Sequence, residues 1–226
     1  MEVLTHVPVD LGLERVLSRL RIGEDDEDAQ SVRELLARVT PIIKPKAIYD
    51  LSSIGEKGAD SVEIGGVLFS SRVLRVNLDQ AYRVFPYIAT CGMELEIVPE
   101  VPNDPLHSYW LNEIRAMAVS AAVTHLREHI DSRFKPGHMA HMAPGSIEDW
   151  PIGQQVQLFS LFPDVQEQIG VRLTDSFLMI PMKSVSGVLF PTETDFESCR
   201  LCPRTVCPGR RAPYDAHLWE KQYAER

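Results

Sequence analysis

The stretch GVRLTDSFLMIPMKSVSGVLF, from Gly170 to Phe190, decides how the rest of the chain can fold. It carries no charge between Asp175 and Lys183, yet Pro181 and Gly187 interrupt it. Proline removes a backbone donor and glycine weakens regular structure, so a continuous buried helix is excluded. Taken on its own, the stretch predicts a pair of core strands with serines in the turns.

The composition is that of a globular protein. The 226 residues are 44% apolar and 24% charged, and the formal net charge is −9. A chain of this length buries enough surface to fold without disulfides or a structural metal. The acidic balance argues against binding to nucleic acid or to an anionic membrane surface. The N-terminal residues do not resemble a signal peptide and no apolar run could span a membrane, so we expect a cytoplasmic protein.

Several segments have apolar residues at helical spacing. Helices are predicted over 10–21, in a second segment that ends at about Val39, and most strongly over 105–130, where alanines are dense. A further amphipathic helix is predicted over 151–162, after a loop that covers 131–150. Short helices are expected in SSRVLRVNLDQAY and after the turn TCG.

The pattern of apolar residues changes from helical spacing to short β-rich runs after residue 45. AIYDLSSI, SVEIGGVLF and RVFPYIAT are β-rich runs separated by glycine and proline, and IGG predicts a tight hairpin. Helices mixed with short strands, without regular alternation, predict an α+β fold. We expect one folded unit made of an N-terminal helical segment (1–45), a central region (46–191) and a Cys- and Arg-rich tail (192–226).

The chain contains four cysteines, and three of them are clustered in the tail as Cys199-x2-Cys202-x4-Cys207. In a reducing compartment, clustered cysteines are more often metal ligands than disulfides. Thiolates favour zinc, copper(I) or an iron–sulfur cluster, and a closed zinc site needs four ligands. Cys91 is the remaining thiol, and His217 is the nearest imidazole after the cluster. Free thiols on a flexible tail and a redox disulfide are the alternatives.

The opening stretch resembles a segment of the reactivation domain of cobalamin-dependent methionine synthase, with the pattern G-x-x-L-T-[ED]-S-x-x-M-x-P-x-x-S-V-S-G. The matching residues are Leu173, Thr174, Asp175, Ser176, Met179, Pro181, Ser184, Val185, Ser186 and Gly187. The upstream segment MAPGSIEDWPIGQQVQLFSLF resembles the family's R-x-A-P-G-Y turn and the helix that follows it. The resemblance extends over about 46–191.

The resemblance implies a single curved α+β domain with short antiparallel or mixed strands and a long Ala-rich helix. It also implies that the domain binds S-adenosylmethionine in an extended pose. The binding residues that it implies are His141, Ala143, Pro144, Gly145, Ser146, Thr174, Asp175, Ser184, Ser186 and Gly187. No catalytic residue is implied, because the protein's part is to bring a methyl group to cobalt. We expect the ribbon Thr174–Gly187 and the bend Pro144–Gly145 to face each other across a cleft.

The chain departs from the family pattern at two positions of the turn, where His141 and Ser146 replace arginine and tyrosine. The resemblance implies a stand-alone relative that assists reductive methylation of a partner, which is a corrinoid-binding protein or methyltransferase that supplies the corrinoid. The alternative is an electron-transfer or docking subunit of a corrinoid protein. In that case the tail cysteines Cys199, Cys202 and Cys207, with Cys91, would hold an iron–sulfur cluster or zinc.

Overall fold

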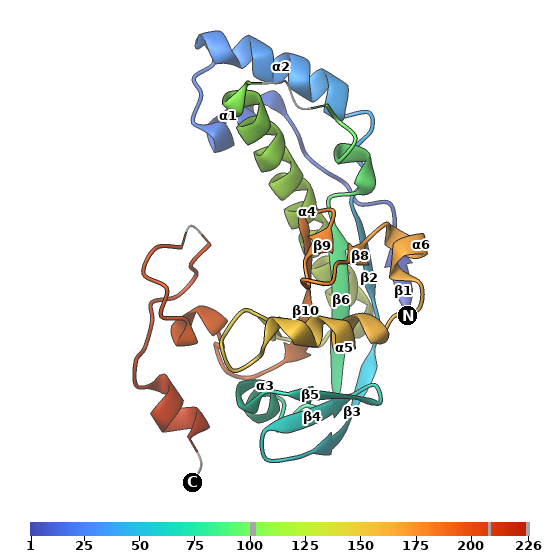
Figure 1. The fold of residues 1–226 in the computed structure, drawn as a ribbon, viewed down its shortest axis with the longest axis vertical. Helices are drawn as coiled ribbons and strands as arrows, with labels where there is room; N and C mark the ends of the chain where they lie inside the picture. Colours follow the sequence, from blue (N-terminus) through green and yellow to red (C-terminus); the bar gives the residue numbers. More distant parts are fainter. Residues whose placement is uncertain (100–102, 208, 225–226) are drawn as a thin grey trace.

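The protein is elongated, with helices at one end, a sheet in the middle and a small β lobe at the other end (Figure 1). The computed structural model describes residues 1–99, 103–207 and 209–224. In chain order the elements are β1 (Glu2–Leu4), α1 (Leu13–Leu20), α2 (Glu27–Val39), β2 (Lys46–Tyr49), β3 (Ser52–Lys57), β4 (Ser61–Ile64), β5 (Val67–Ser70), α3 (Arg72–Asn77), β6 (Arg83–Thr90), η1 (Met93–Leu95), α4 (Pro105–Phe134), β7 (Met139–Met142), η2 (Ile152–Gln154), α5 (Gln155–Ser160), α6 (Val165–Ile169), β8 (Arg172–Leu173), β9 (Met179–Ile180), β10 (Ser184–Pro191), η3 (Ser198–Leu201) and η4 (Trp219–Tyr223).

The central strand of the main sheet is β6, which runs down the middle of the molecule (Figure 1). Its C-terminal half pairs with both β2 and β10, and its first residues pair with β3. β1 extends β2, β4 and β5 extend β3, and β7 extends β10. The pairings among the described strands are antiparallel, and a separate small ribbon joins β8 to β9. The predicted α+β fold is confirmed.

The middle of the sheet is buried on both faces, because successive side chains of a strand point to opposite sides. Tyr49 and Tyr87 pack on one face against α4, where Leu126 belongs to the same cluster. Ile48 and Ile88 pack on the other face against α6 and the residues around it. The sheet therefore holds α4 and the α5–α6 segment on opposite sides and fixes their positions.

The helical end is a second core, formed by α1, α2 and the first half of α4. The carboxylate of Asp104 accepts the backbone N–H of His107 at 2.9 Å, and Pro105 occupies the first turn, as helix starts favour. The helix predicted over 105–130 is confirmed and continues to Phe134. No helix in the described part of the chain is long and apolar enough to cross a membrane.

The N-terminal segment and the tail both join the core. Val16 and Leu35 are fully buried in the helical cluster, so α1 and α2 pack together with the first half of α4. At the other end, Leu218 and Tyr223 belong to the cluster that also contains Trp150 of the segment before η2. The end of the tail therefore packs against the β lobe, in the cluster that contains residues of β4, β5 and α3.

The predicted hairpin is confirmed. Gly65 and Gly66 have φ angles of +58° and +84° and connect β4 to β5. Glycine adopts this left-handed backbone without a steric penalty, and the two-residue turn fits the twist of the paired strands. The short helix expected in SSRVLRVNLDQAY is also confirmed, as α3.

Three local predictions need correction. The expected loop 131–150 contains the strand β7. The segment MAHM is too short to show a strand pattern by itself, and it forms a strand because it pairs with β10. The helix expected over 151–162 is shorter and consists of η2 and α5. The helix expected after TCG is the single turn η1, and residues 100–102 lie outside the described residues.

A half-buried carboxylate ties the segment before η2 to the start of α3. Asp149 accepts the hydroxyl hydrogen of Ser71 and the backbone N–H groups of Arg72 and Val73, the last at 3.0 Å. These N–H groups lack partners within the helix, so Asp149 acts as a cap supplied from 76 residues further along the chain.

We predict that Asp149→Ala lowers the free energy of unfolding by about 2–3 kcal/mol, because it leaves three donors at the start of α3 without an acceptor. Urea denaturation followed by circular dichroism measures the change. The neighbouring exposed residue provides the control: Glu148→Ala should change stability by less than about 0.5 kcal/mol. Equal effects of the two substitutions would contradict the capping role.

Candidate ligand-binding cleft

A cavity of about 520 Å³ lies between α4, β7, β10 and the segments that follow β10. The size is in the range of pockets that bind cofactors and other small molecules. We call this cavity the α4–β10 cleft. Its lining residues are Tyr87, Ser120, Val123, Thr124, Arg127, His138, Met139, Ala140, His141, Val185, Asp195, Phe196, Glu197 and Arg211.

His141 is the only one of the predicted binding residues in this lining. Its Nε2 lies 3.0 Å from the hydroxyl of Tyr87, a side chain that is 2% exposed. Burial, with the charges of Arg127 and Arg211, lowers the pKa of His141 to about 4, against the opposing effect of a hydrogen bond to the Ser186 backbone. Burial also raises the pKa of Tyr87 to about 12. At neutral pH the pair is therefore an uncharged imidazole and a protonated phenol.

Gly187 makes room for the His141 ring. The ladder between β10 and β7 pairs Val188 with Met142 and Leu189 with His141. A Cβ atom at Gly187 would collide with Nε2 of His141 and stand 2.5 Å from the backbone oxygen of Met142. Since real Cβ atoms do not approach other heavy atoms this closely, only glycine allows β7 and the His141 ring to lie as they do.

The cleft carries charges of both signs. Arg127 comes from α4, and Arg211, Asp195 and Glu197 come from the segments after β10. Nε of Arg211 lies 2.9 Å from a carboxylate oxygen of Glu197, so these two neutralise each other. Within residues 1–99, 103–207 and 209–224, no hydrogen bond or ion pair occupies the guanidinium of Arg127. The cleft thus offers one half-buried cation, Arg127, and one exposed carboxylate, Asp195.

The two serines of the SVSG segment do not face this cleft. The hydroxyl of Ser184 lies 2.9 Å from the hydroxyl of Thr90, and that of Ser186 lies 3.1 Å from the side-chain oxygen of Gln155. Val185, between them, lines the cleft. The strand is present as predicted, but its small polar residues point to the opposite side and bind other parts of the protein.

The predicted residues Thr174 and Asp175 lie at the tip of the β8–β9 ribbon. The Thr174 hydroxyl oxygen accepts the backbone N–H of Leu178 at 3.0 Å, so it closes its own turn. Asp175 is exposed. Neither residue lines the α4–β10 cleft.

The predicted bend, Ala143–Ser146, follows directly on β7. Its Gly145 donates its N–H to the backbone oxygen of Trp150 at 2.7 Å, and the Ser146 hydroxyl donates to the oxygen of Ala143 at 2.6 Å. Pro144 between them is buried. The bend is therefore held by its own hydrogen bonds, at the end of the strand whose other residues line the cleft.

The space expected between this bend and the ribbon is filled by η2. A Cβ atom at Gly145 would stand 2.7 Å from a methyl carbon of Ile152, and one at Gly153 would stand 3.5 Å from the ring of Phe177. The bend and the ribbon thus both pack on the same short turn. The prediction of an open cleft between them needs correction, and the α4–β10 cleft lies on the other side of β10.

The four predicted thiol ligands are not brought together. Cys91 is fully buried in the helical cluster, where burial raises the pKa of its thiol to about 12. Cys199, Cys202 and Cys207 are half-buried in the tail. The described ranges contain no group of three or more His, Cys, Asp or Glu side chains placed to hold a metal.

A guanidinium organises the loop that carries the tail cysteines. Arg210 donates to the backbone oxygens of Cys199 at 3.0 Å, Ala212 at 3.1 Å and Cys202 at 3.2 Å, and also to that of Arg204. Several carbonyl groups therefore converge on one fixed cation. The loop whose cysteine spacing predicted a metal site is therefore stabilised by an arginine.

Sequence reasoning missed most of the cleft, but a signal for one wall was present. Ser120, Val123, Thr124 and Arg127 are spaced by three, four and seven residues, which places them on one face of a helix. The apolar pattern of the same helix shows that this face is not the one that packs into the core. The opposite wall depends on the path of the tail, for which the sequence has no local signal.

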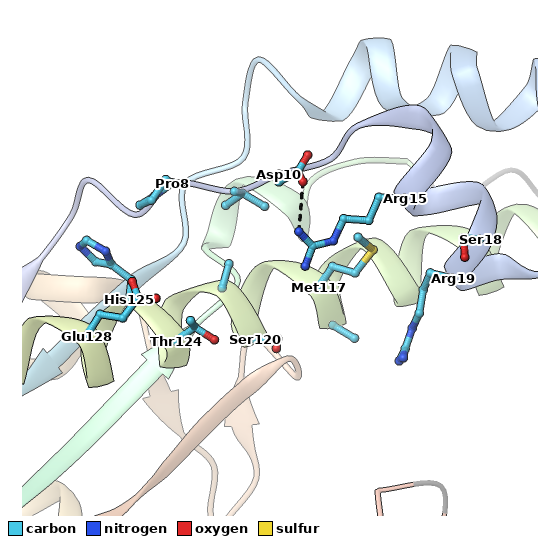
Figure 2. Close-up of a pocket in the computed structure, with 13 residues that line it drawn as sticks. Pro8, Asp10, Arg15, Ser18, Arg19, Met117, Ser120, Thr124, His125 and Glu128 are labelled. Atoms are coloured by element: carbon cyan, nitrogen blue, oxygen red, sulfur yellow. Dashed lines mark hydrogen bonds and ion pairs between the residues drawn. The ribbon is translucent and has the colours of Figure 1, made fainter. Parts of the chain in front are cut away.

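A second hollow, of about 670 Å³, shares Ser120 and Thr124 of α4 with the cleft and lies on the side toward α1. Figure 2 shows Arg15 and Asp10 paired on the α1 side of this hollow, and their side chains are 3.0 Å apart. Both side chains are 65% exposed, so the pair is largely hydrated and contributes little. The polar face of α4 therefore lies between two depressions.

Comparisons with known proteins agree with this architecture. Residues 143–197, which run from the bend to the wall of the cleft, match the family described as "Vitamin B12 dependent methionine synthase, activation domain". A crystal structure of the MetH reactivation domain bound to AdoHcy superposes with a TM-score of 0.61 at 14% identity. The alignment covers 86% of this chain and 82% of that one.

The chain has the fold of the methionine synthase reactivation domain. The resemblance to this domain in the opening stretch is therefore matched both by the family model and by the arrangement of helices and strands. No curated protein sequence matches the chain. At 14% identity, a shared fold leaves room for different polar residues, such as His141 in place of arginine.

We predict that Gly187→Ala lowers the free energy of unfolding by at least about 2 kcal/mol, because the added methyl group must displace β7 or the His141 ring. Chemical denaturation measures the loss. Gly209→Ala is the control, since a Cβ atom there meets nothing within 4 Å, and it should leave stability within about 0.5 kcal/mol. If both substitutions are neutral, the close contact described here is wrong.

We predict that His141 makes stability depend on pH. Its pKa is about 4 in the folded protein against an ordinary value of 6.5, so the unfolded chain binds this proton more readily. Its contribution is present above pH 6.5 and is lost as the pH falls toward 4. Between pH 7 and 5, wild type should lose about 2 kcal/mol more than His141→Gln in urea denaturation. His138→Gln, at an exposed position, should follow wild type; a His141→Gln curve parallel to wild type would contradict the assignment.

Proposed function

We propose that the protein binds S-adenosylmethionine in the α4–β10 cleft and presents its methyl group to a corrinoid held by a partner protein. The observation that carries the proposal is the cleft itself, which has the volume of a cofactor pocket and is bounded by the segment that matches the activation-domain family. The structurally similar domain is bound to AdoHcy, the product that remains when S-adenosylmethionine gives up its methyl group.

The chemistry of the lining fits this ligand. S-adenosylmethionine carries a sulfonium and an ammonium, which are cations, together with a carboxylate and an adenine ring. The exposed carboxylate of Asp195 and the Glu197–Arg211 pair lie on one wall, and Arg127 places positive charge on another. Val185 and Phe196 provide apolar surface for a flat ring. A site of this kind needs a few fixed polar groups on a largely apolar frame.

The contribution of the protein is to position the methyl donor. S-adenosylmethionine supplies an activated methyl group, and cobalt(I) of the partner's corrinoid is the nucleophile that would accept it. Reduction of inactive cobalt(II) requires an external one-electron donor. Holding the donor rigidly against β7 and α4 raises the rate by fixing the distance and angle of attack. No side chain of this chain has to exchange a proton in such a transfer.

The sheet gives this positioning its rigidity. The cleft floor is β10 paired with β7, and β10 is in turn paired with β6 along residues 184–189. α4 packs on the same sheet through fully buried side chains such as Leu126. Sites on regular elements hold ligands more accurately than sites on loops.

The alternative role, electron transfer or docking through a metal centre on the tail cysteines, stays a prediction. No observation favours it, because Cys91 is buried in a separate cluster and Arg210 occupies the centre of the tail loop. The identity of the corrinoid partner also stays a prediction.

We predict that S-adenosylmethionine and its demethylated product bind the wild-type protein and raise its melting temperature. Filling the cleft should prevent this: Val185→Trp should abolish the heat of binding in isothermal titration while the variant remains folded. Val206→Trp is the control, since Val206 is 82% exposed on the tail, and it should bind like wild type. Absence of binding to wild type at millimolar ligand would overturn the proposal.

A further inference from the structure

We infer that Arg127 of α4 holds the carboxylate of the ligand in the α4–β10 cleft. The inference rests on the proposed function and adds to it the residue that recognises the amino-acid end of the ligand. It assigns the anionic subsite to Arg127 on the helix wall of the cleft, and not to His141 of β7.

The first step is the state of the Arg127 side chain. It is half-buried and lines the cleft, yet no group in the described part of the chain accepts a hydrogen bond from it. The other cationic wall residue, Arg211, is already paired with Glu197 at 2.9 Å. A guanidinium presents five N–H donors in a planar fork, and two of them match the two oxygens of a carboxylate. A ligand carboxylate would accept hydrogen bonds from the Arg127 N–H donors that no described protein group uses.

The second step excludes His141 from this role. Its ring is seated over Gly187, and its Nε2 is engaged by the hydroxyl of Tyr87 at 3.0 Å. A neutral imidazole in this position offers neither a positive charge nor a fork of donors. The charge of Arg127 contributes to keeping the imidazole neutral, which is consistent with the two groups sharing one small space.

The third step is the direction in which the ligand would lie. Ser120 and Thr124 precede Arg127 on the same helix face and supply hydroxyl groups along it. Asp195 lines the cleft from the segment after β10 with an exposed carboxylate, which can face the ammonium and sulfonium groups. The arrangement selects a zwitterionic amino-acid end, with its carboxylate toward α4 and its cationic groups toward the tail.

The test compares two ligands on two substitutions. Arg127→Gln should weaken binding of S-adenosylmethionine by about 10- to 100-fold, since one charge-assisted pair is lost. The same substitution should change binding of decarboxylated S-adenosylmethionine less than about threefold, because that ligand keeps the sulfonium and the amine but lacks the carboxylate. Arg133→Gln, on the same helix but paired with Glu2 outside the cleft, is the control and should bind both ligands like wild type.

The outcomes separate this inference from the proposed function. If wild type binds S-adenosylmethionine and Arg127→Gln binds it equally well, the role of Arg127 is overturned and the cleft proposal stands. If Arg127→Gln weakens both ligands equally, Arg127 shapes the cleft without recognising a carboxylate, and the inference also fails. If wild type binds neither ligand, the proposed function fails and the inference falls with it. Arg127→Lys, which keeps the charge without the fork, should lose less affinity than Arg127→Gln.

Discussion

The site depends on the close contact between the His141 ring and the backbone of Gly187, which has no side chain. β7 is only four residues long, and its place in the sheet comes entirely from its ladder with β10. Any side chain at Gly187 would push that ladder apart. Once β7 is in place, it fixes the bend at Ala143–Ser146 and leaves a cavity under α4. The absence of a Cβ atom at Gly187 therefore allows β7 to pair at the edge of the sheet and leaves space for the cleft beside it.

Much of the fold follows from local sequence signals, whereas most of the site does not. The hairpin at Gly65 and Gly66, the central strand β6 and the long helix α4 each carry a signal within their own residues. β7 has none, because it forms only when β10, more than 40 residues later, pairs with it. The cleft joins α4, β10 and the tail, so its position depends on tertiary packing. One part was predictable: because strand residues alternate, Ser184 and Ser186 must share the face opposite to Val185.

The polar residues of the cleft differ from those of the family turn, although the fold is that of the reactivation domain. The family turn carries arginine where this chain has His141, and burial keeps that imidazole neutral. A cation stands nearby on Arg127, from the facing helix. The tail adds the paired Arg211 and Glu197 to the outer wall. The tail loop is in turn shaped by Arg210, so the cysteine-rich segment has a structural place in the molecule.

The central claim is that the α4–β10 cleft is where a methyl donor lies. A crystal structure of the protein grown with S-adenosylmethionine tests it most directly. The account predicts density for the ligand between α4 and β10, with its carboxylate against the guanidinium of Arg127 and its sulfonium toward the tail. Density for the ligand in the hollow between α1 and α4, or beside the β8–β9 ribbon, with the cleft free of it, would contradict the account.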